Sequence, residues 1–256
     1  MYQSTDFIFD NLSSVDLGLQ LVKVNIDKNI ETFVSQRNLA EERVKNNTYL
    51  YNIEFENLAF ECEFASVTPI DEKRKNEISR IFFKDTYTNF IPQDSLKVYN
   101  CIAKSGSLNV FPSGFYFSLS FVCSSPFASS ALIAQQFDIT TANTIIEINN
   151  QGNVNTNIIA EIKIKTTGQS IQITNITNGG QFIKLDTDSS NNQLQQNETI
   201  TIDFKKNRIK TDTLGVYRYS NLQSSSRFFD LVVGKNQLKI SQPCFLTIYY
   251  RNLYLC

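Results

Sequence analysis

Alternating hydrophobic and polar residues form the most regular pattern in the chain, and the clearest example lies between residues 115 and 123. One face of this segment is hydrophobic and consists of Phe115, Phe117, Leu119, Phe121 and Cys123. The other face carries Tyr116, Ser118 and Ser120. A period of two over this length predicts a β-strand with one face in a hydrophobic core.

A second alternating region precedes it, with hydrophobic residues at Ile53, Phe55, Leu58, Phe60, Cys62 and Phe64. The phase of the alternation changes by one at Asn57. An extra residue in a strand shifts the phase in this way, so we expect a β-bulge or a tight kink there.

The pattern changes to a helical one between Pro69 and Phe83. Thr68 can cap this segment, and Pro69 suits the first helical position. Asp71 and Glu72 would meet the positive end of the helix dipole. One hydrophobic stripe follows the helical period and consists of Ile70, Ile78, Ile81 and Phe82. A single helix among strands predicts an α+β first half.

Beyond residue 130, short isoleucine-rich runs alternate with polar segments. The runs are centred on residues 162–164, 171–173, 200–204, 238–240 and 246–250, and turn signals lie at 178–180, 188–192, 206–207 and 234–236. Several short strands with this spacing predict a β-sandwich. The segment from Ser124 to Ser130 has the composition of a connection. We therefore expect a mainly β protein with two domains, residues 1–132 and 133–256.

Composition restricts the function. The chain of 256 residues has no His, so it can form neither a Ser-His-Asp triad nor a His-ligated zinc site. Its 24 Lys and Arg residues against 25 Asp and Glu residues give a net charge of −1, which disfavours sequence-specific nucleic-acid binding. The halves differ in charge: residues 1–130 carry 12 − 16 = −4, and residues 131–256 carry 12 − 9 = +3.

The five cysteines are an odd number and contain no CxxC pair. Cys62 and Cys123 are in phase with hydrophobic neighbours, so buried thiols are favoured over a metal site or a disulfide framework. The N-terminal segment lacks the features of a secretory signal. Residues 105–137 carry no charge, but Pro112, Gly114 and Pro126 interrupt them, so we expect strands and no membrane insertion.

Three groups of residues could carry chemistry, and each has a simpler interpretation. Glu61 and Glu63 share a strand face and resemble the paired carboxylates of a glycosidase, but a solvated strand face is favoured. Residues 186–190 begin like a calcium loop but lack its Gly and its final Glu, which favours a polar hairpin loop. The basic run 205–210 could form a nucleic-acid-binding patch, but it is centred on Asn207, which favours a solvated hairpin turn. We therefore predict no catalytic, cofactor-binding or metal-binding residues and no enzymatic activity.

Several segments are more informative in their order along the chain than any single motif. In the first half these segments are 6–19, 35–37, 49–64, the helix ending at Phe83 and followed by Phe90-Ile91-Pro92, and 114–126. In the second half they are 171–175, 179–180, 198–203, 228–236 and 246–251. Their order resembles the distal tail (Dit) proteins of long-tailed bacteriophages, and the resemblance covers nearly the whole chain.

This resemblance implies a structural hub at the tail tip, in the virion at the distal end of the tail. Six copies would form a ring through the N-terminal domain, with galectin-like or carbohydrate-binding-module-like sandwiches projecting from it. Expected partners are further copies of the chain, in one ring or two stacked rings, the tail-tube protein, the tail-associated lysin or tip protein, and receptor-binding proteins. No cofactor is implied.

A carbohydrate-binding adhesin or receptor-binding module is the competing hypothesis. Tyr217, Tyr219, Tyr249 and Tyr250 could stack on sugars, although aromatic residues at alternating strand positions more commonly pack in the core or across strands. A hydrolase would need a second carboxylate from a distant strand, which the sequence does not reveal.

Overall fold

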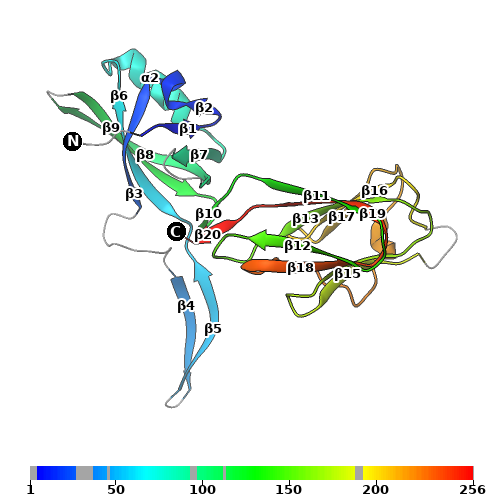
Figure 1. Ribbon diagram of the computed structural model, residues 1–256. Coiled ribbons are helices and arrows are strands. Elements are labelled where there is room, and N and C mark those ends of the chain that lie inside the picture. Colours follow the sequence, from blue (N-terminus) through cyan, green and yellow to red (C-terminus); the bar gives the residue numbers. More distant parts are fainter. Residues whose placement is uncertain are drawn as a thin grey trace. The chain divides into compact units, whose positions relative to one another are not determined.

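The computed structural model describes residues 5–26, 37–44, 47–92, 97–111, 114–187 and 193–255 (Figure 1). The chain divides into two compact units. Unit 1 comprises Met1–Ser130 together with Tyr254–Cys256, and unit 2 comprises Ala131–Leu253. The return of the last residues to unit 1 has no counterpart in the sequence pattern. The predicted division into domains 1–132 and 133–256 stays a proposal.

Unit 1 is built on a seven-stranded sheet. Its strands are β1 (Phe7–Phe9), β2 (Leu12–Ser13), β3 (Leu19–Ile26), β6 (Ala59–Ser66), β7 (Thr88–Pro92), β8 (Tyr99–Phe111) and β9 (Gly114–Cys123). They follow the order β2-β1-β7-β8-β9-β6-β3, and every neighbouring pair is antiparallel. The strand predicted from residues 115–123 is confirmed as β9, with Phe117, Leu119, Phe121 and Cys123 buried.

A helix packs on this sheet through phenylalanine rings. The helix is α2 (Glu72–Phe82), and its buried residues are Ile78 and Phe82. The ring centroid of Phe82 lies 4.7 Å from that of Phe9 and 5.3 Å from that of Phe64. Large aromatic side chains bury much surface at low entropic cost, so a cluster of this kind supplies most of a small core.

The start of the helix differs from the prediction. Asp71 is the N-cap, and its Oδ1 accepts a hydrogen bond of 2.7 Å from the backbone N–H of Arg74. Thr68 and Pro69 lie outside the helix. Asp is a strong N-cap residue, so the helix begins directly after Asp71 and not at Pro69. A short helix that the sequence pattern did not predict, α1 (Ser14–Leu17), is capped by Ser13.

The phase change at Asn57 is not a bulge within a strand. Strand β5 (Asn47–Phe55) ends before Asn57, and β6 begins after it. The two strands belong to different sheets, since β5 pairs with β4 (Arg37–Val44) and β6 pairs with β3 and β9. The alternation restarts because the chain passes from one sheet to the other.

The predicted connection between the halves contains a strand. Strand β10 (Phe127–Ser129) lies within it and pairs with β20 (Leu253–Leu255) at the end of the chain. No helix of the described residues is long and apolar enough to span a membrane. The uncharged stretch 105–137 contributes to β8, β9, β10 and the next strand, as expected.

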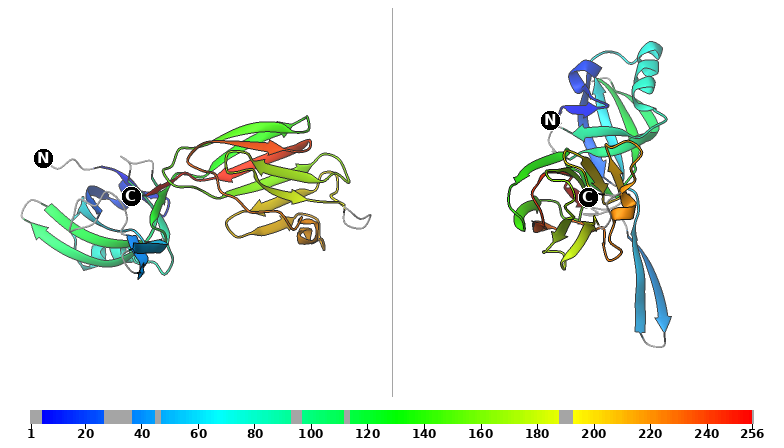
Figure 2. Two further views of the ribbon diagram at one scale, coloured as in Figure 1. Left: turned by 90° about the horizontal axis from the view of Figure 1, so that it is seen from below. Right: turned by 90° about the vertical axis from the view of Figure 1, so that its right-hand side faces the viewer.

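Unit 2 is a sandwich of two sheets, as predicted. The first contains β11 (Ile133–Ile139), β13 (Ile158–Ile164), β16 (Thr199–Asp203), β17 (Arg208–Thr211) and β19 (Cys244–Tyr250) in the order β11-β19-β13-β16-β17. The second contains β12 (Thr144–Asn150), β14 (Ile171–Asn175), β15 (Gln181–Leu185) and β18 (Gly234–Ile240) in the order β12-β18-β14-β15. A 3-10 helix, η1 (Arg218–Asn221), follows β17. Isoleucines from both sheets form one core. Figure 2 shows the strands of both units in two further views.

The described cysteines are buried free thiols, as the sequence predicted for Cys62 and Cys123. They are Cys62, Cys101, Cys123 and Cys244, whereas Cys256 lies outside the described residues. Burial raises the pKa of the Cys244 thiol to about 12, although the nearby Lys165 ammonium opposes this shift. Such a thiol is almost fully protonated near neutral pH and is a weak nucleophile.

Candidate assembly interface

Strands β4 and β5 form a hairpin that belongs to neither large sheet. We call this hairpin the arm. Figure 1 shows it extending beyond the ends of β3 and β6 as a two-stranded ribbon. A two-stranded ribbon without a packing partner has marginal stability in water. The arm is therefore a candidate for a surface of unit 1 that another molecule covers.

The register of the arm places three of its hydrophobic residues on one face. Leu39 lies opposite Ile53, and Glu41, two residues further along the same strand, lies opposite Leu50. Residues two apart in a strand share a face, and so do directly opposed residues. Leu39, Leu50 and Ile53 consequently lie on one largely apolar face, which also carries Glu41, and the three hydrophobic residues are 53 %, 51 % and 41 % exposed.

This arrangement depends on a register shift between Ala40 and Glu41. Without the shift, Glu41 would pair with residue 51, and Leu50 would point to the opposite face of the ribbon. The bulge therefore collects the three hydrophobic side chains on a single side. We call this side the arm face.

The opposite side of the arm is polar around residues 38 and 52–54. Asn38 lies opposite Glu54, and Ala40 lies opposite Asn52. The Nδ2 of Asn38 donates to Glu56 at 3.2 Å, and the Nδ2 of Asn52 donates to Glu54 at 3.0 Å. The arm is thus amphipathic. A polar side suits water, and an exposed contiguous apolar side is typical of an interaction surface.

A second apolar surface of unit 1 lies between α2 and the β8–β9 hairpin. It is a cavity of about 300 Å³ whose apolar lining includes Ile78, Phe83, Leu108 and Leu119. Phe83 is 44 % exposed and Leu108 is 38 % exposed. We call this cavity the helix recess.

The carboxylates that the sequence singled out do not form a pair with acids of other strands. Glu61 and Glu63 lie on the half-buried face of β6, between buried core residues, and their cross-strand neighbours on β9 are Ser120 and Ser118. Among the residues that the structure describes, no group of three or more His, Cys, Asp or Glu could hold a metal ion. The Oε2 of Glu61 is buried, which differs from the solvated strand face that the sequence predicts, and the absence of a catalytic role for the two glutamates stays a prediction.

Of the other candidate groups, the basic run forms a turn, and most of the calcium-like segment lies outside the described residues. Asp186 forms an ion pair of 2.7 Å with Lys184, and residues 188–192 of the calcium-like segment lie outside the described residues. Asn207 adopts a positive φ of 49° in the turn between β16 and β17, which confirms the hairpin predicted for the basic run.

The four tyrosines do not share one role. Tyr250 is buried in the sandwich core, and the hydroxyl of Tyr249 donates to Glu161 at 2.9 Å. The hydroxyl of Tyr219 donates to the carbonyl of Asn207 at 3.1 Å, whereas Tyr217 is 81 % exposed. Core packing is confirmed for Tyr250.

Sequence reasoning missed the arm. The segment 37–44 shows little alternation, because Glu41, Glu42 and Arg43 follow one another. The usable signal was the Asn46-Asn47 pair between two stretches of strand-forming residues, which is typical of a hairpin turn.

Two family models match the chain, one for each half. Residues 2–125 match the phage tail protein N-terminal domain, and residues 151–254 match the siphovirus-type tail component, C-terminal domain. Unit 1 contains the first match, and the sandwich contains nearly all of the second.

Individual proteins agree with the family models. The SPbeta prophage-derived uncharacterized protein YomH of Bacillus subtilis (strain 168) is 25 % identical over 274 residues, covering 99 % of both chains. The SPP1 Dit (gp 19.1) protein, a hub of the adsorption apparatus in phages that infect Gram-positive bacteria, matches in fold with a TM-score of 0.74 at 15 % identity, over 99 % of this chain and 100 % of that one. A chain of the phage P2 baseplate in its activated conformation matches with a TM-score of 0.52 at 6 % identity, over 98 % of each.

Proposed function

We propose that the chain is a distal tail (Dit) protein of a siphovirus-type phage and that six copies close into a ring through unit 1. The protein is a structural component of the tail hub at the distal end of the virion tail, where it assembles with other tail components. The family resemblance supports the number six. One ring, or two rings back to back, would continue the tail tube.

The arm face is the observation that carries this proposal. A cyclic oligomer with more than two subunits needs two different surfaces on each copy, one of which binds the other on the next copy. Unit 1 offers such surfaces in the arm face and the helix recess, both apolar and both exposed. We propose that the arm of one copy packs against unit 1 of its neighbour, with the helix recess as the candidate acceptor.

The proposed neighbours in the virion follow from the position of a hub. The tail-tube protein would contact one side of the ring, and the tail-associated lysin or tip protein the other. The sandwiches would carry receptor-binding proteins and so contribute to host attachment. The acidic balance of residues 1–130 suits a channel that must release DNA, because a basic lining would retain it.

We propose that the hub has no catalytic role. The absence of His removes the commonest general base near neutral pH. Glu61 and Glu63 face serines rather than a second acid across the sheet. Both observations support a protein that functions through its binding surfaces and not through catalysis.

The ring can be tested on the purified full chain by light scattering and negative-stain electron microscopy. We expect a mass of six or twelve times 29.2 kDa and particles with six-fold symmetry. Particles with another rotational symmetry would contradict the number six, and a monomer at the highest attainable concentration would contradict ring formation by this chain alone.

A further inference from the structure

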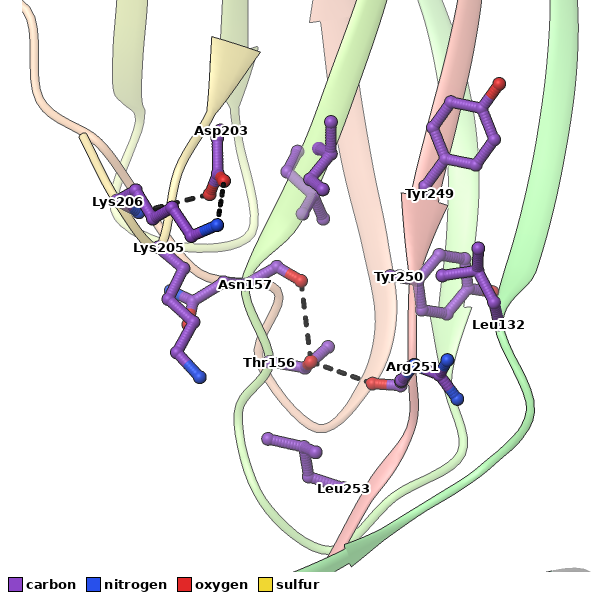
Figure 3. A pocket seen from close by; sticks show the side chains of 12 residues that line it. Leu132, Thr156, Asn157, Asp203, Lys205, Lys206, Tyr249, Tyr250, Arg251 and Leu253 are labelled. Carbon is purple, nitrogen blue, oxygen red and sulfur yellow. Dashed lines mark hydrogen bonds and ion pairs between the residues drawn. The ribbon is translucent and has the colours of Figure 1, made fainter. Parts of the chain in front are cut away.

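Unit 2 contains a cavity of about 300 Å³ formed only by its own residues, at one end of the five-stranded sheet (Figure 3). Its centre is the outward face of β13. Ile159 lies there, with Asp203 opposite on β16 and Tyr249 opposite on β19. Leu132 and Leu253 add further apolar surface. Ile159 is 37 % exposed and Leu132 is 55 % exposed, so the cavity has an accessible apolar floor.

Positive charge surrounds this floor. Lys205, Lys206 and Arg251 line the cavity together with one acid, Asp203. Figure 3 shows Lys205 and Arg251 on opposite sides of the cavity. Three cations outnumber the Asp203 carboxylate in the lining and the Asp230 carboxylate behind Asn157, and the net positive charge favours an anionic ligand.

The single acid is already engaged. The Oδ1 of Asp203 accepts a hydrogen bond of 3.1 Å from the backbone N–H of Lys206, and its Oδ2 lies 3.9 Å from the Nζ of Lys206. Among the described residues, no ion pair involves Lys205, whose side chain is exposed in the turn between β16 and β17. The Lys205 ammonium is therefore available to an incoming anion.

Internal hydrogen bonds fix the polar wall of the cavity. The hydroxyl of Thr156 donates to the carbonyl of Arg251 at 2.7 Å, and the side-chain amide of Asn157 donates to the carboxylate of Asp230. These bonds hold the wall in place, so that Lys205 at the rim is the group that can select a ligand by charge.

We propose that this cavity binds a small anionic polyol or sugar. Its carbon skeleton would lie on Ile159, Leu132 and Leu253, and its phosphate or carboxylate group between Lys205 and Arg251. A volume of about 300 Å³ is at the lower end of the range for small-molecule sites, which fits a ligand of monosaccharide size better than an extended peptide. This site does not depend on ring formation by unit 1.

The test is ligand-observed NMR on the full-length protein, first with glycerol 3-phosphate, glucuronate and the neutral controls glycerol and glucose, and then with inorganic phosphate and a glutamate-containing tripeptide. We expect saturation transfer to at least one anion and none to the neutral controls, and the stronger anion identifies the source as phosphate or carboxylate. Lys205→Glu should weaken that binding at least ~10-fold by replacing attraction with repulsion. Lys210→Glu is the matched control, because Lys210 lies on the same hairpin, is exposed and does not line the cavity.

Several results would overturn the proposal. One is the absence of transfer to both anions, and another is an equal loss of binding in Lys205→Glu and Lys210→Glu, which would indicate unspecific attraction. Inorganic phosphate bound as tightly as glycerol 3-phosphate would remove the role of the apolar floor. A glutamate-containing tripeptide that displaces either anion at lower concentration would point to a peptide site instead.

Ile159→Asp, checked for folding by circular dichroism, should also abolish binding, because it places a carboxylate on the floor of the cavity.

Discussion

Arg218 and Glu198 form a bidentate ion pair inside unit 2, with 2.7 Å between Nε and Oε1 and 2.6 Å between Nη2 and Oε2. Their side chains are 2 % and 0 % exposed. Glu198 also accepts hydrogen bonds from the hydroxyl of Thr211 and the backbone N–H of Gln195, and Arg218 donates to the carbonyl of Gln193. The pair thus joins β17, η1 and the segment before β16.

Arg218→Met should destabilise unit 2 strongly. The substitution leaves the Glu198 carboxylate buried without its charge partner, which costs about 3–5 kcal/mol in comparable cases. Urea unfolding followed by circular dichroism measures this loss. Lys184→Met is the control, because Lys184 and Asp186 also form a close ion pair, but their side chains are 30 % and 33 % exposed. The control should lose about 0–1 kcal/mol. Equal losses would show that burial does not distinguish the two pairs.

The stability of unit 2 should decrease in acid through Glu198. Burial raises the pKa of this carboxyl, but hydrogen bonds from Arg218, Gln195 and Thr211 together with the charge of Arg218 outweigh burial and bring the pKa below its ordinary value of 4.5. A carboxyl whose pKa is lowered by folding stabilises the protein above its unfolded pKa, and this contribution is lost as the pH falls through the folded pKa.

We therefore expect the free energies of unfolding of the wild type and Glu198→Gln to differ most above pH 4.5 and to converge below it. Other acids, including Asp212 and Asp230, are present in both proteins and cancel in the difference. Urea titrations at a series of pH values test this expectation. A difference that stays constant through the acidic range would contradict it.

The arm face should control assembly without affecting the fold of the isolated chain. Leu50→Lys combined with Ile53→Lys places two charges on this face, and burying them against a neighbour is costly. We expect the ring to give way to monomers in light scattering. The melting temperature of the monomer should change little, because both side chains lie outside the two cores.

The matched control for the arm is Ala40→Lys, which adds a charge to the opposite side of the same hairpin. It should leave the ring intact. If Ala40→Lys also dissociates the ring, the charge of the arm rather than its apolar face governs assembly. If the double variant still forms rings, the arm face is not part of the interface.

The sequence predicted those parts of the fold that depend on local periodicity. Strand β9 and the short strands of the sandwich alternate regularly because one face of each lies in a core. The helix was predicted with its N-terminus too early, since both Thr68 and Asp71 are suitable caps and the choice depends on how the preceding chain leaves β6. The chain order of segments carried the family resemblance better than any single motif.

The candidate sites could not be predicted in the same way. The arm face exists only because a register shift at Ala40 moves Leu50 to the side of Leu39, and a register shift is a property of two paired strands. The ion pair between Glu198 and Arg218 joins residues 20 positions apart, with no periodic signal between them. The cavity near Ile159 likewise combines side chains from separate strands and turns.

Gly152 should tolerate no side chain, because a Cβ at this position would lie 2.2 Å from the carbonyl oxygen and 2.8 Å from the nitrogen of Leu253. The contacted backbone cannot easily move, since Asn153 donates to the Leu253 carbonyl at 3.0 Å and Val154 forms a bridge with Leu253. Gly152→Ala should therefore lower the free energy of unfolding of unit 2 by about 1–3 kcal/mol, the usual cost of overpacking. Gln151→Ala is the control: this exposed neighbour should change stability by less than about 0.5 kcal/mol. Urea unfolding measures both variants, and equal stabilities would mean that the loop can move away and that the close approach to Leu253 is not required for the fold.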